Sequence, residues 1–282
     1  MKKKFWDKFV SWESAQEAWE REAFTASQTL PLKTLPVLPK IPGITRDTAR
    51  GLKWKSLLYL FKHDANKVIQ RYVLRHPIRY GIAFLRSLLQ RKSYTREGDF
   101  FLYGLRNMEA FENLLLKKDT LLIAGFSYCH KPLECPSGRF NDACQHDLTN
   151  PICKQCFIGK ALHALPHDNV IPLFIPTIHY IGEKIFETLE RYPKRSITFL
   201  ITACEMTLEM FGDWGNMVGI QGLGIRLDGR ICNTMQAFIL SERGIKPGLT
   251  VVLEPTQKKI LELIRLFRSS SPPGNDTNDQ KV

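Results

Sequence analysis

The stretch ITFLITACEMTLEMF, residues 197–211, places a strand, a cysteine and the start of a helix in direct succession. Residues 197–203 form a short apolar, β-rich run typical of a buried strand, and residues 205–211 begin a helix. The same alternation continues on both sides. Further strands are expected at 121–127, 170–175, 217–227 and 249–253, and further helices at 157–165, 178–191 and 257–267. This alternation predicts an α/β fold with a three-layer, mostly parallel sheet.

Charge divides the chain into regions. The net charge is +12, and most of it lies in residues 51–96, which hold eleven Lys and Arg and one acid, Asp64. This region has helical periodicity and interleaved aromatics, so it presents either a basic binding surface or a solvated helical face. The sequence predicts an amphipathic helix over 1–28, a proline-rich linker over 29–46, a basic helical region over 47–119, a Rossmann-like, cysteine-rich α/β metal-binding domain over 120–268 and a disordered tail over 269–282.

The N-terminal residues have a basic start but then mix acids among their aromatics, so they lack the apolar core of a signal peptide. The apolar runs are also far shorter than the roughly 20 residues of a spanning helix. We therefore expect a cytoplasmic protein, which the basic region would allow to attach to the inner face of the membrane.

The seven cysteines are the main clue to function, and all lie between residues 129 and 232. In a reducing compartment, an odd number of clustered thiols favours metal ligation or redox chemistry over disulfides. Two of them form a C-x-x-C pair at a predicted helix start, and Cys129 and Cys204 follow strands that emerge on the same edge if the sheet is parallel. The candidate metal ligands are Cys129, Cys135, Cys144, Cys153, Cys156, Cys204 and Cys232.

The order of three segments, CKQCFIGKA (153–161), ITACEMTLEM (201–210) and VGIQGLGIRLDGRICNT (218–234), resembles the cysteine-rich family called domain of unknown function 116. The resemblance covers about residues 120–250. It implies a Rossmann-like α/β unit, candidate iron–sulfur or other metal binding and no assigned reaction. In this family the matching cysteines are Cys153, Cys156, Cys204 and Cys232. The chain departs from the family where Glu205 replaces a frequent proline and Ile231 replaces a glycine.

Four thiolates are enough to close a zinc site or to hold an iron–sulfur cluster, and seven exceed what one zinc requires. We therefore expect an iron–sulfur cluster, with zinc as the alternative, although the spacing differs from the ferredoxin cysteine runs. His130 and His146 flank the cysteines and are alternative ligands. We interpret His163, His167 and His179 as surface or core residues.

Three functions follow. The leading hypothesis is an iron–sulfur protein with a redox or maturation role beside a partner enzyme or redox protein. The first alternative is a zinc-braced interaction protein whose basic face, residues 51–96, binds an anionic membrane or an acidic partner, with nucleic acid ranked below them. The second is a thiol-dependent enzyme with Cys204 as nucleophile. Residues 219–224 are glycine-rich but are not a nucleotide motif, and we interpret them as a closely packed strand.

Overall fold

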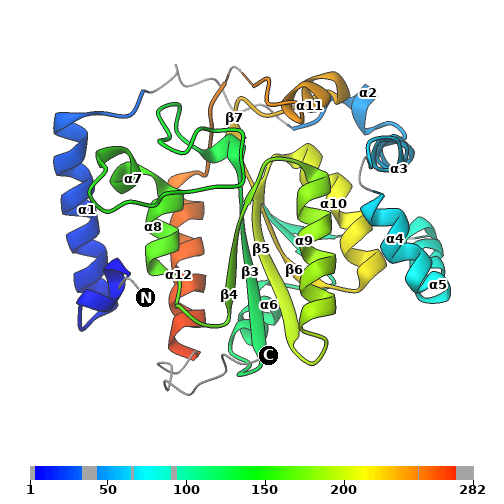
Figure 1. Ribbon diagram of the computed structural model, residues 1–282, viewed down its shortest axis with the longest axis horizontal. Coiled ribbons are helices and arrows are strands. Elements are labelled where there is room, and N and C mark those ends of the chain that lie inside the picture. Colours follow the sequence, from blue (N-terminus) through cyan, green and yellow to red (C-terminus); the bar gives the residue numbers. More distant parts are fainter. Residues whose placement is uncertain (1–3, 34–42, 65–66, 90–93, 247, 271–282) are drawn as a thin grey trace.

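A six-stranded sheet forms the centre of the computed structural model, which describes residues 4–33, 43–64, 67–89, 94–246 and 248–270 (Figure 1). The strand order is β1-β2-β6-β5-β3-β4. The last four strands are parallel, whereas β2 pairs antiparallel with β6 and with β1. The strands are β1 (Thr95–Glu97), β2 (Phe100–Tyr103), β3 (Thr120–Ser127), β4 (Val170–Ile175), β5 (Ser196–Ala203) and β6 (Gln221–Arg226). The predicted α/β fold with a mostly parallel sheet is confirmed.

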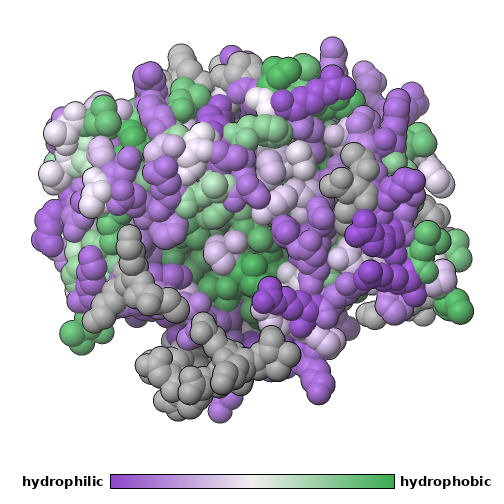
Figure 2. Space-filling view, viewed as in Figure 1, coloured by the Kyte–Doolittle hydropathy of each residue, from purple (hydrophilic) through white to green (hydrophobic). Residues whose placement is uncertain are grey.

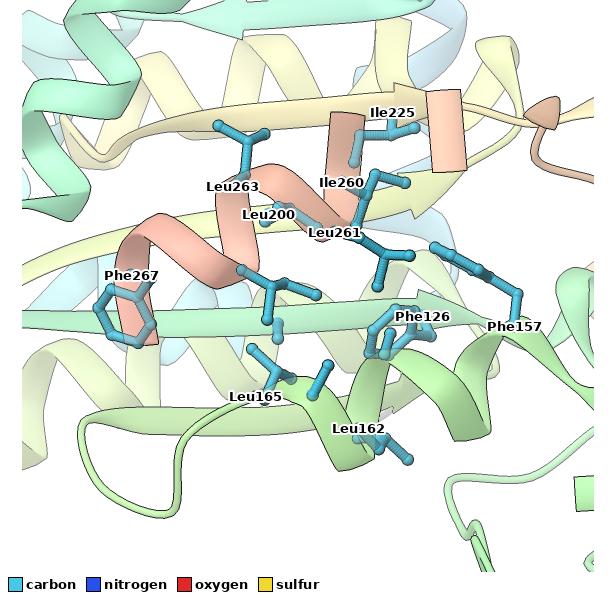
Figure 3. Packing of buried hydrophobic residues seen from close by; sticks show 14 of the residues in the cluster. Phe126, Phe157, Leu162, Leu165, Leu200, Ile225, Ile260, Leu261, Leu263 and Phe267 are labelled. Carbon is cyan, nitrogen blue, oxygen red and sulfur yellow. The ribbon is translucent and has the colours of Figure 1, made fainter. Parts of the chain in front are cut away.

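One face of the sheet packs on helices from both ends of the chain (Figure 1). Figure 3 shows this core, in which Phe126 of β3 and Leu200 of β5 meet Phe157 and Ile260 from the covering helices. Removing these apolar side chains from water is the main force that holds the layer in place. The elements on this face are η1 (Phe5–Lys8), α1 (Trp12–Thr29), α6 (Met108–Leu115), α8 (Phe157–Ala164) and α12 (Glu254–Ser270).

The opposite face carries a second core with its own helices. Phe199 and Ile201 of β5 point into this core, so β5 is apolar on both faces, as its continuous apolar sequence predicts. The helices on this side are α3 (Leu52–Lys62), α4 (Val68–Arg75), α5 (Pro77–Leu89), α9 (Ile178–Arg191), α10 (Glu205–Val218) and α11 (Met235–Ser241), with the short α2 (Arg46–Ala49) before them. Within the described residues, no helix is both long and apolar enough to cross a bilayer.

The N-terminal segment belongs to the same core as the sheet. Phe5 and Trp6 of η1 are 3% exposed, and Trp19 of α1 is 4% exposed. Their rings meet at centroid distances of 5.1 to 5.9 Å. The prediction of a single helix over this segment is wrong in one respect, because η1 ends before α1 begins. Ser11 caps the start of α1 by accepting a hydrogen bond from the Ser14 amide. The aromatic stripe therefore packs against the α/β domain.

The prediction of a purely helical region over residues 47–119 is wrong for residues 95–103. This segment forms the hairpin β1-β2, whose two-residue turn contains Gly98 at φ +60°. Such a left-handed turn matches the twist of a tight hairpin. Strand β2 then pairs with β6 and extends the central sheet. Most of the proline-rich segment (residues 34–42) and of the tail (271–282) lies outside the described residues.

Two strand predictions near the end of the chain are also corrected. The strand expected at 217–227 begins only at Gln221, because α10 continues to Val218 and Gly219, at φ +70°, separates it from β6. The strand expected at 249–253 is the two-residue β8 (Thr250–Val251). It pairs with β7 (Asp228–Gly229) in a separate small sheet.

The side of the sheet to which the chain adds its next strand changes at β3. From β3 the chain moves through α8 to β4 on one side, and later through α9 and α10 to β5 and β6 on the other. The helices of these connections therefore lie on opposite faces of the sheet, which leaves a crevice at the carboxyl ends of β3 and β5. Open α/β sheets bind their ligands at such a switch point.

Close packing of β6 against β5 provides a test of this core. A Cβ added at Gly222 would lie 2.5 Å from Cδ1 of Phe199 and 2.6 Å from its carbonyl oxygen. Because Phe199 is also the paired residue on β5, we expect Gly222→Ala to lower the free energy of unfolding by about 2 kcal/mol. Gly81→Ala is the control, since nothing lies within 4 Å of its added Cβ, and urea denaturation should show little loss there. Equal losses for both variants would contradict this packing.

Candidate functional site

The parallel sheet brings three distant cysteines together at the switch point. Cys129 lies in η2 (Tyr128–His130), directly after β3, and Cys204 lies between β5 and α10. Because β3 and β5 are parallel neighbours, both emerge at the same edge, as the sequence predicts. Cys232 lies in the segment that follows β7 (Asp228–Gly229). We call Cys129, Cys204 and Cys232 the switch-point thiols; each is only 4% exposed.

A lysine lies among the switch-point thiols. Nζ of Lys246 is 3.6 Å from Sγ of Cys232. Burial lowers the pKa of Lys246, but the attraction of Cys129 and of the other two thiols outweighs burial and raises it above the ordinary value. The ammonium is therefore held beside the sulfurs, where it favours a thiolate.

Cys204 and Cys232 interact directly. Donation from the Cys232 thiol, the Lys246 charge and hydrogen bonds from Thr207 lower the pKa of Cys204 against the effect of burial. The hydroxyl of Thr207 is 3.2 Å from Sγ of Cys204, at the first turn of α10. The same interaction raises the pKa of Cys232. The arrangement is two neighbouring thiols that favour one shared negative charge, with a cation near both.

A carboxyl group completes this region. Glu242, just after α11, accepts a hydrogen bond of 2.9 Å from the Ile178 amide at the start of α9. Burial raises its pKa to about 8, and the neighbouring charge of Cys204 adds to this effect. Cys129, Cys204 and Glu242 line a cavity of about 20 Å³. The site therefore combines thiols beside a cation with an acid that favours its protonated form near neutral pH.

The other four cysteines form a separate group. Cys135, Cys144, Cys153 and Cys156 line a cavity of about 10 Å³ and interact electrostatically with one another. We call them the loop thiols. Cys153 lies in the short helix α7 (Pro151–Gln155), and Cys156 lies at the junction of α7 and α8. The seven predicted ligands are therefore divided into two sets of three and four.

Backbone amides point at the sulfurs of the loop thiols. The amides of Gly159 and Ile158, in the first turn of α8, donate to Cys156, and the amide of His146 donates to Cys144. Burial nevertheless raises the pKa of Cys156 to about 12 and that of Cys144 to about 11. The helix start was expected to favour the thiolate. As free thiols, these groups remain protonated because burial outweighs the amides.

Two cations organise the cysteine loop, and neither was predicted from the sequence. Lys131 is 1% exposed, and its ammonium donates to the carbonyls of Gly138, Asn141 and Ala143. The guanidinium of Arg139 donates to the Cys129 carbonyl at 3.4 Å and to the carbonyls of Lys246 and Gly248. Arg139 thus links the loop to the segment that carries Lys246.

Most of the histidines make hydrogen bonds within the fold. The ring of His163 accepts from the Phe5 amide and contacts the His146 carbonyl, and His167 and His179 also have hydrogen-bond partners. His146 acts on Cys144 through its backbone amide. Nδ1 of His130 is buried and has no hydrogen-bond partner among the described residues, and burial lowers the pKa of this ring to about 4. Its ring packs against Phe157 at 5.6 Å.

Cys156 can be approached from a larger cavity. A cavity of about 720 Å³ lies between α1, the start of α8 and the small β7-β8 sheet, and Cys156 and His130 form part of its wall. Lys154, Lys160 and Arg230 also line it. The first two are paired with Glu22 and Glu20 of α1, at 2.9 and 3.0 Å. The cavity is thus a route from the surface to one of the loop thiols.

The thiols are not arranged as a closed coordination shell. No three His, Cys, Asp or Glu side chains in the described part of the chain are placed to hold a metal ion as they stand. Comparisons with protein-family models, curated proteins and solved structures found no match to this chain. The resemblance to domain of unknown function 116 therefore stays a prediction.

Glu242 gives a pH-dependent test of the switch-point region. A folded pKa near 8, against an ordinary value of 4.5, means that the folded state retains a proton which the unfolded chain releases. Stability from this group is thus complete below about pH 4.5 and is lost as the pH rises towards 8. Gln keeps the acceptor for the Ile178 amide without titrating. We expect Glu242→Gln to exceed the wild type in free energy of unfolding by about 2 kcal/mol at pH 8.

The measurement is urea denaturation of both proteins from pH 5 to 8 with reductant present. Subtracting the two curves removes the titrations that the proteins share. A difference that stays constant over this range would contradict the raised pKa.

Proposed function

We propose that this chain is a metal–thiolate protein in which the loop thiols hold the metal. The observation that supports it most is the group of four thiols around one small cavity, with amides already directed at two of the sulfurs. Amide donors to sulfur stabilise and tune bound metal–thiolate groups. Metal binding requires the four thiols to lose their protons.

The size of the cavity bears on which metal group the loop thiols could hold. A cavity of about 10 Å³ holds about one atom. A single tetrahedral zinc or iron ion fits with a small inward movement of the sulfurs, whereas an iron–sulfur cluster requires them to separate. The loop between Lys131 and Asn150 contains no long helix or strand, so it can adjust to either. We keep the iron–sulfur cluster as the predicted cofactor and zinc as the alternative.

The residues around the loop thiols suit a negatively charged metal group. Four thiolates around a divalent ion carry a net charge of −2, and the Lys131 ammonium lies near Cys135, Cys144 and Cys156. If the cofactor is iron-based, it supplies one-electron transfer; if it is zinc, it supplies structural bracing. Cys156 borders the large cavity with basic walls. An acidic partner enzyme or redox protein would approach the site from this side.

The proposal predicts that metal content depends on the loop thiols and not on the switch-point thiols. We expect the protein purified anaerobically to contain iron with matching sulfide, or stoichiometric zinc. Cys153→Ser should remove at least half of the metal, because a serine hydroxyl is a poor ligand for a soft ion. Cys232→Ser is the matched control and should retain it. Metal analysis and the visible spectrum provide the measurement.

The outcomes separate the alternatives. A brown protein with iron and sulfide indicates a cluster, and colourless protein with zinc indicates a bracing ion. Metal that is lost equally in Cys153→Ser and Cys232→Ser would place the centre elsewhere. A metal-free protein that folds in the presence of chelator would overturn the proposal.

A second candidate function is supported by the thiolate at the switch point. Cys204 would attack a disulfide substrate, with its sulfur forming a mixed disulfide and the first substrate thiolate leaving. Cys232, after losing its proton, would displace the second thiolate and close a Cys204–Cys232 disulfide. Two electrons pass from the cysteine pair to the substrate, and the substrate becomes two thiols. The low pKa of Cys204 beside the protonated Cys232 supports these roles.

This second function predicts selective alkylation. At pH 6 Cys204 should react with iodoacetamide faster than Cys232, because only the thiolate is nucleophilic. Lys246→Met should slow the labelling of Cys204 at least fivefold by removing the nearby charge, and Lys258→Met on exposed α12 is the control. Peptide mass spectrometry reads each site separately. Labelling of Cys204 that is no faster than that of Cys232, or that is unchanged in Lys246→Met, would exclude Cys204 as the nucleophile.

A further inference from the structure

The helices that form the outermost layer on the α10 side carry large apolar residues on their solvent side. On α3, Trp54, Leu58 and Phe61 are 61%, 71% and 50% exposed. On α5, Ile78, Ile82 and Leu85 are 78%, 51% and 60% exposed, and Leu74 of α4 is 73% exposed. Figure 2 shows hydrophobic side chains at the right-hand margin, where Figure 1 places α3, α4 and α5. We call these seven residues the outer apolar face.

The spacing shows that the outer apolar face is a continuous stripe on each helix. The three residues of α3 and the three of α5 each follow the pattern i, i+4, i+7, which places them along one side of a helix. The opposite sides are already used, since Leu52, Tyr59 and Tyr80 are buried in the core against the sheet layer. These helices are therefore apolar on two sides, and folding accounts for only one of them.

The helices of the outer apolar face carry exposed cations. Lys55, Lys62, Lys67 and Arg71 are exposed on α3, on α4 and before α4. The one acid among residues 51–96, Asp64, is 8% exposed. An exposed acid lies nearby on α9, where Glu190 pairs with Arg75 of α4 at 2.6 Å. An apolar stripe on helices whose own described, exposed charges are cations is the pattern of an interfacial helix on an anionic bilayer.

We propose that the outer apolar face docks this protein on a membrane surface rich in anionic lipid. Trp54, Leu58 and Ile78 would enter the boundary between head groups and acyl chains, and the lysines would lie at the level of the phosphates. Charge complementarity favours this occupant over a second copy of the chain, because two such basic faces repel.

Docking by this face leaves the cysteines accessible. The loop thiols lie beside α7 and α8, and α8 packs on the face of the sheet opposite to α3 and α5 (Figure 1). The large cavity that reaches Cys156 is lined by α1 and the small β7-β8 sheet, away from the outer apolar face. A protein bound to the membrane in this way presents the thiol loop to a partner in solution.

The test is flotation of the full chain with vesicles of phosphatidylcholine alone or with 30% phosphatidylglycerol. We expect binding to the anionic vesicles that weakens at least fivefold between 0.1 and 0.5 M NaCl. The variant with Trp54→Glu and Leu58→Glu should bind at least tenfold more weakly. Val10→Glu with Leu30→Glu adds the same charge at apolar positions that are 107% and 50% exposed outside this face. This control should bind within about twofold to threefold of the wild type.

Other results would overturn the proposal. Failure of the wild type to bind either kind of vesicle would exclude a membrane role. Equal losses in the two double variants would show that only net charge matters. A dimer in size-exclusion chromatography that Trp54→Glu with Leu58→Glu dissociates, without vesicle binding, would assign the face to a second copy. Circular dichroism confirms that each variant is folded.

Discussion

The parallel pairing of β3 with β5 is the constraint on which the rest of the structure depends. These strands are neighbours in space but are separated in sequence by the cysteine loop, the helices α7, α8 and α9, and β4. Their register, which sets Thr120 opposite Ser196 and Phe126 opposite Thr202, places Cys129 and Cys204 at one edge. Because both strands are buried on both faces, a one-residue slip in register would exchange the side chains of the two faces and disrupt the packing of both cores. The position of the switch-point thiols is thus a consequence of core packing.

The cysteine loop depends on a different force. It contributes few large apolar residues to the cores, and buried hydrogen bonds from cations hold it instead. The Lys131 ammonium satisfies loop carbonyls that would otherwise have no partner in the interior, and Arg139 connects the loop to residues 246 and 248. The Lys131 ammonium also lies near Cys135, Cys144 and Cys156. One set of interactions therefore both fixes the loop and compensates the charge that thiolates would bring.

The sequence predicted the elements with a strong local signal. The strands at 121–127 and 197–203 are continuous apolar runs, and their boundaries are nearly those observed. The hairpin at 95–103 was missed because its strands are short and follow a long helical pattern. The division of the cysteines was missed because it depends on tertiary approach: Lys246 and Cys204 are 42 positions apart, and no spacing rule joins them. The common edge of Cys129 and Cys204 was predictable, since it follows from strand direction alone.

The outer apolar face shows why periodicity alone gave an ambiguous result for residues 51–96. A helix with one apolar side packs on a core and leaves a polar side in water. Here Tyr59 of α3 and Tyr80 of α5 are buried in the core, whereas Trp54 and Ile78 are exposed on the outer side. Apolar residues therefore occupy two sides of these helices, and the cations lie between them. The inner contacts alone would hold these helices on α10. Replacing the outer residues by polar ones would leave that packing intact. The fold therefore does not account for the apolar outer side, whereas contact with a second apolar environment would.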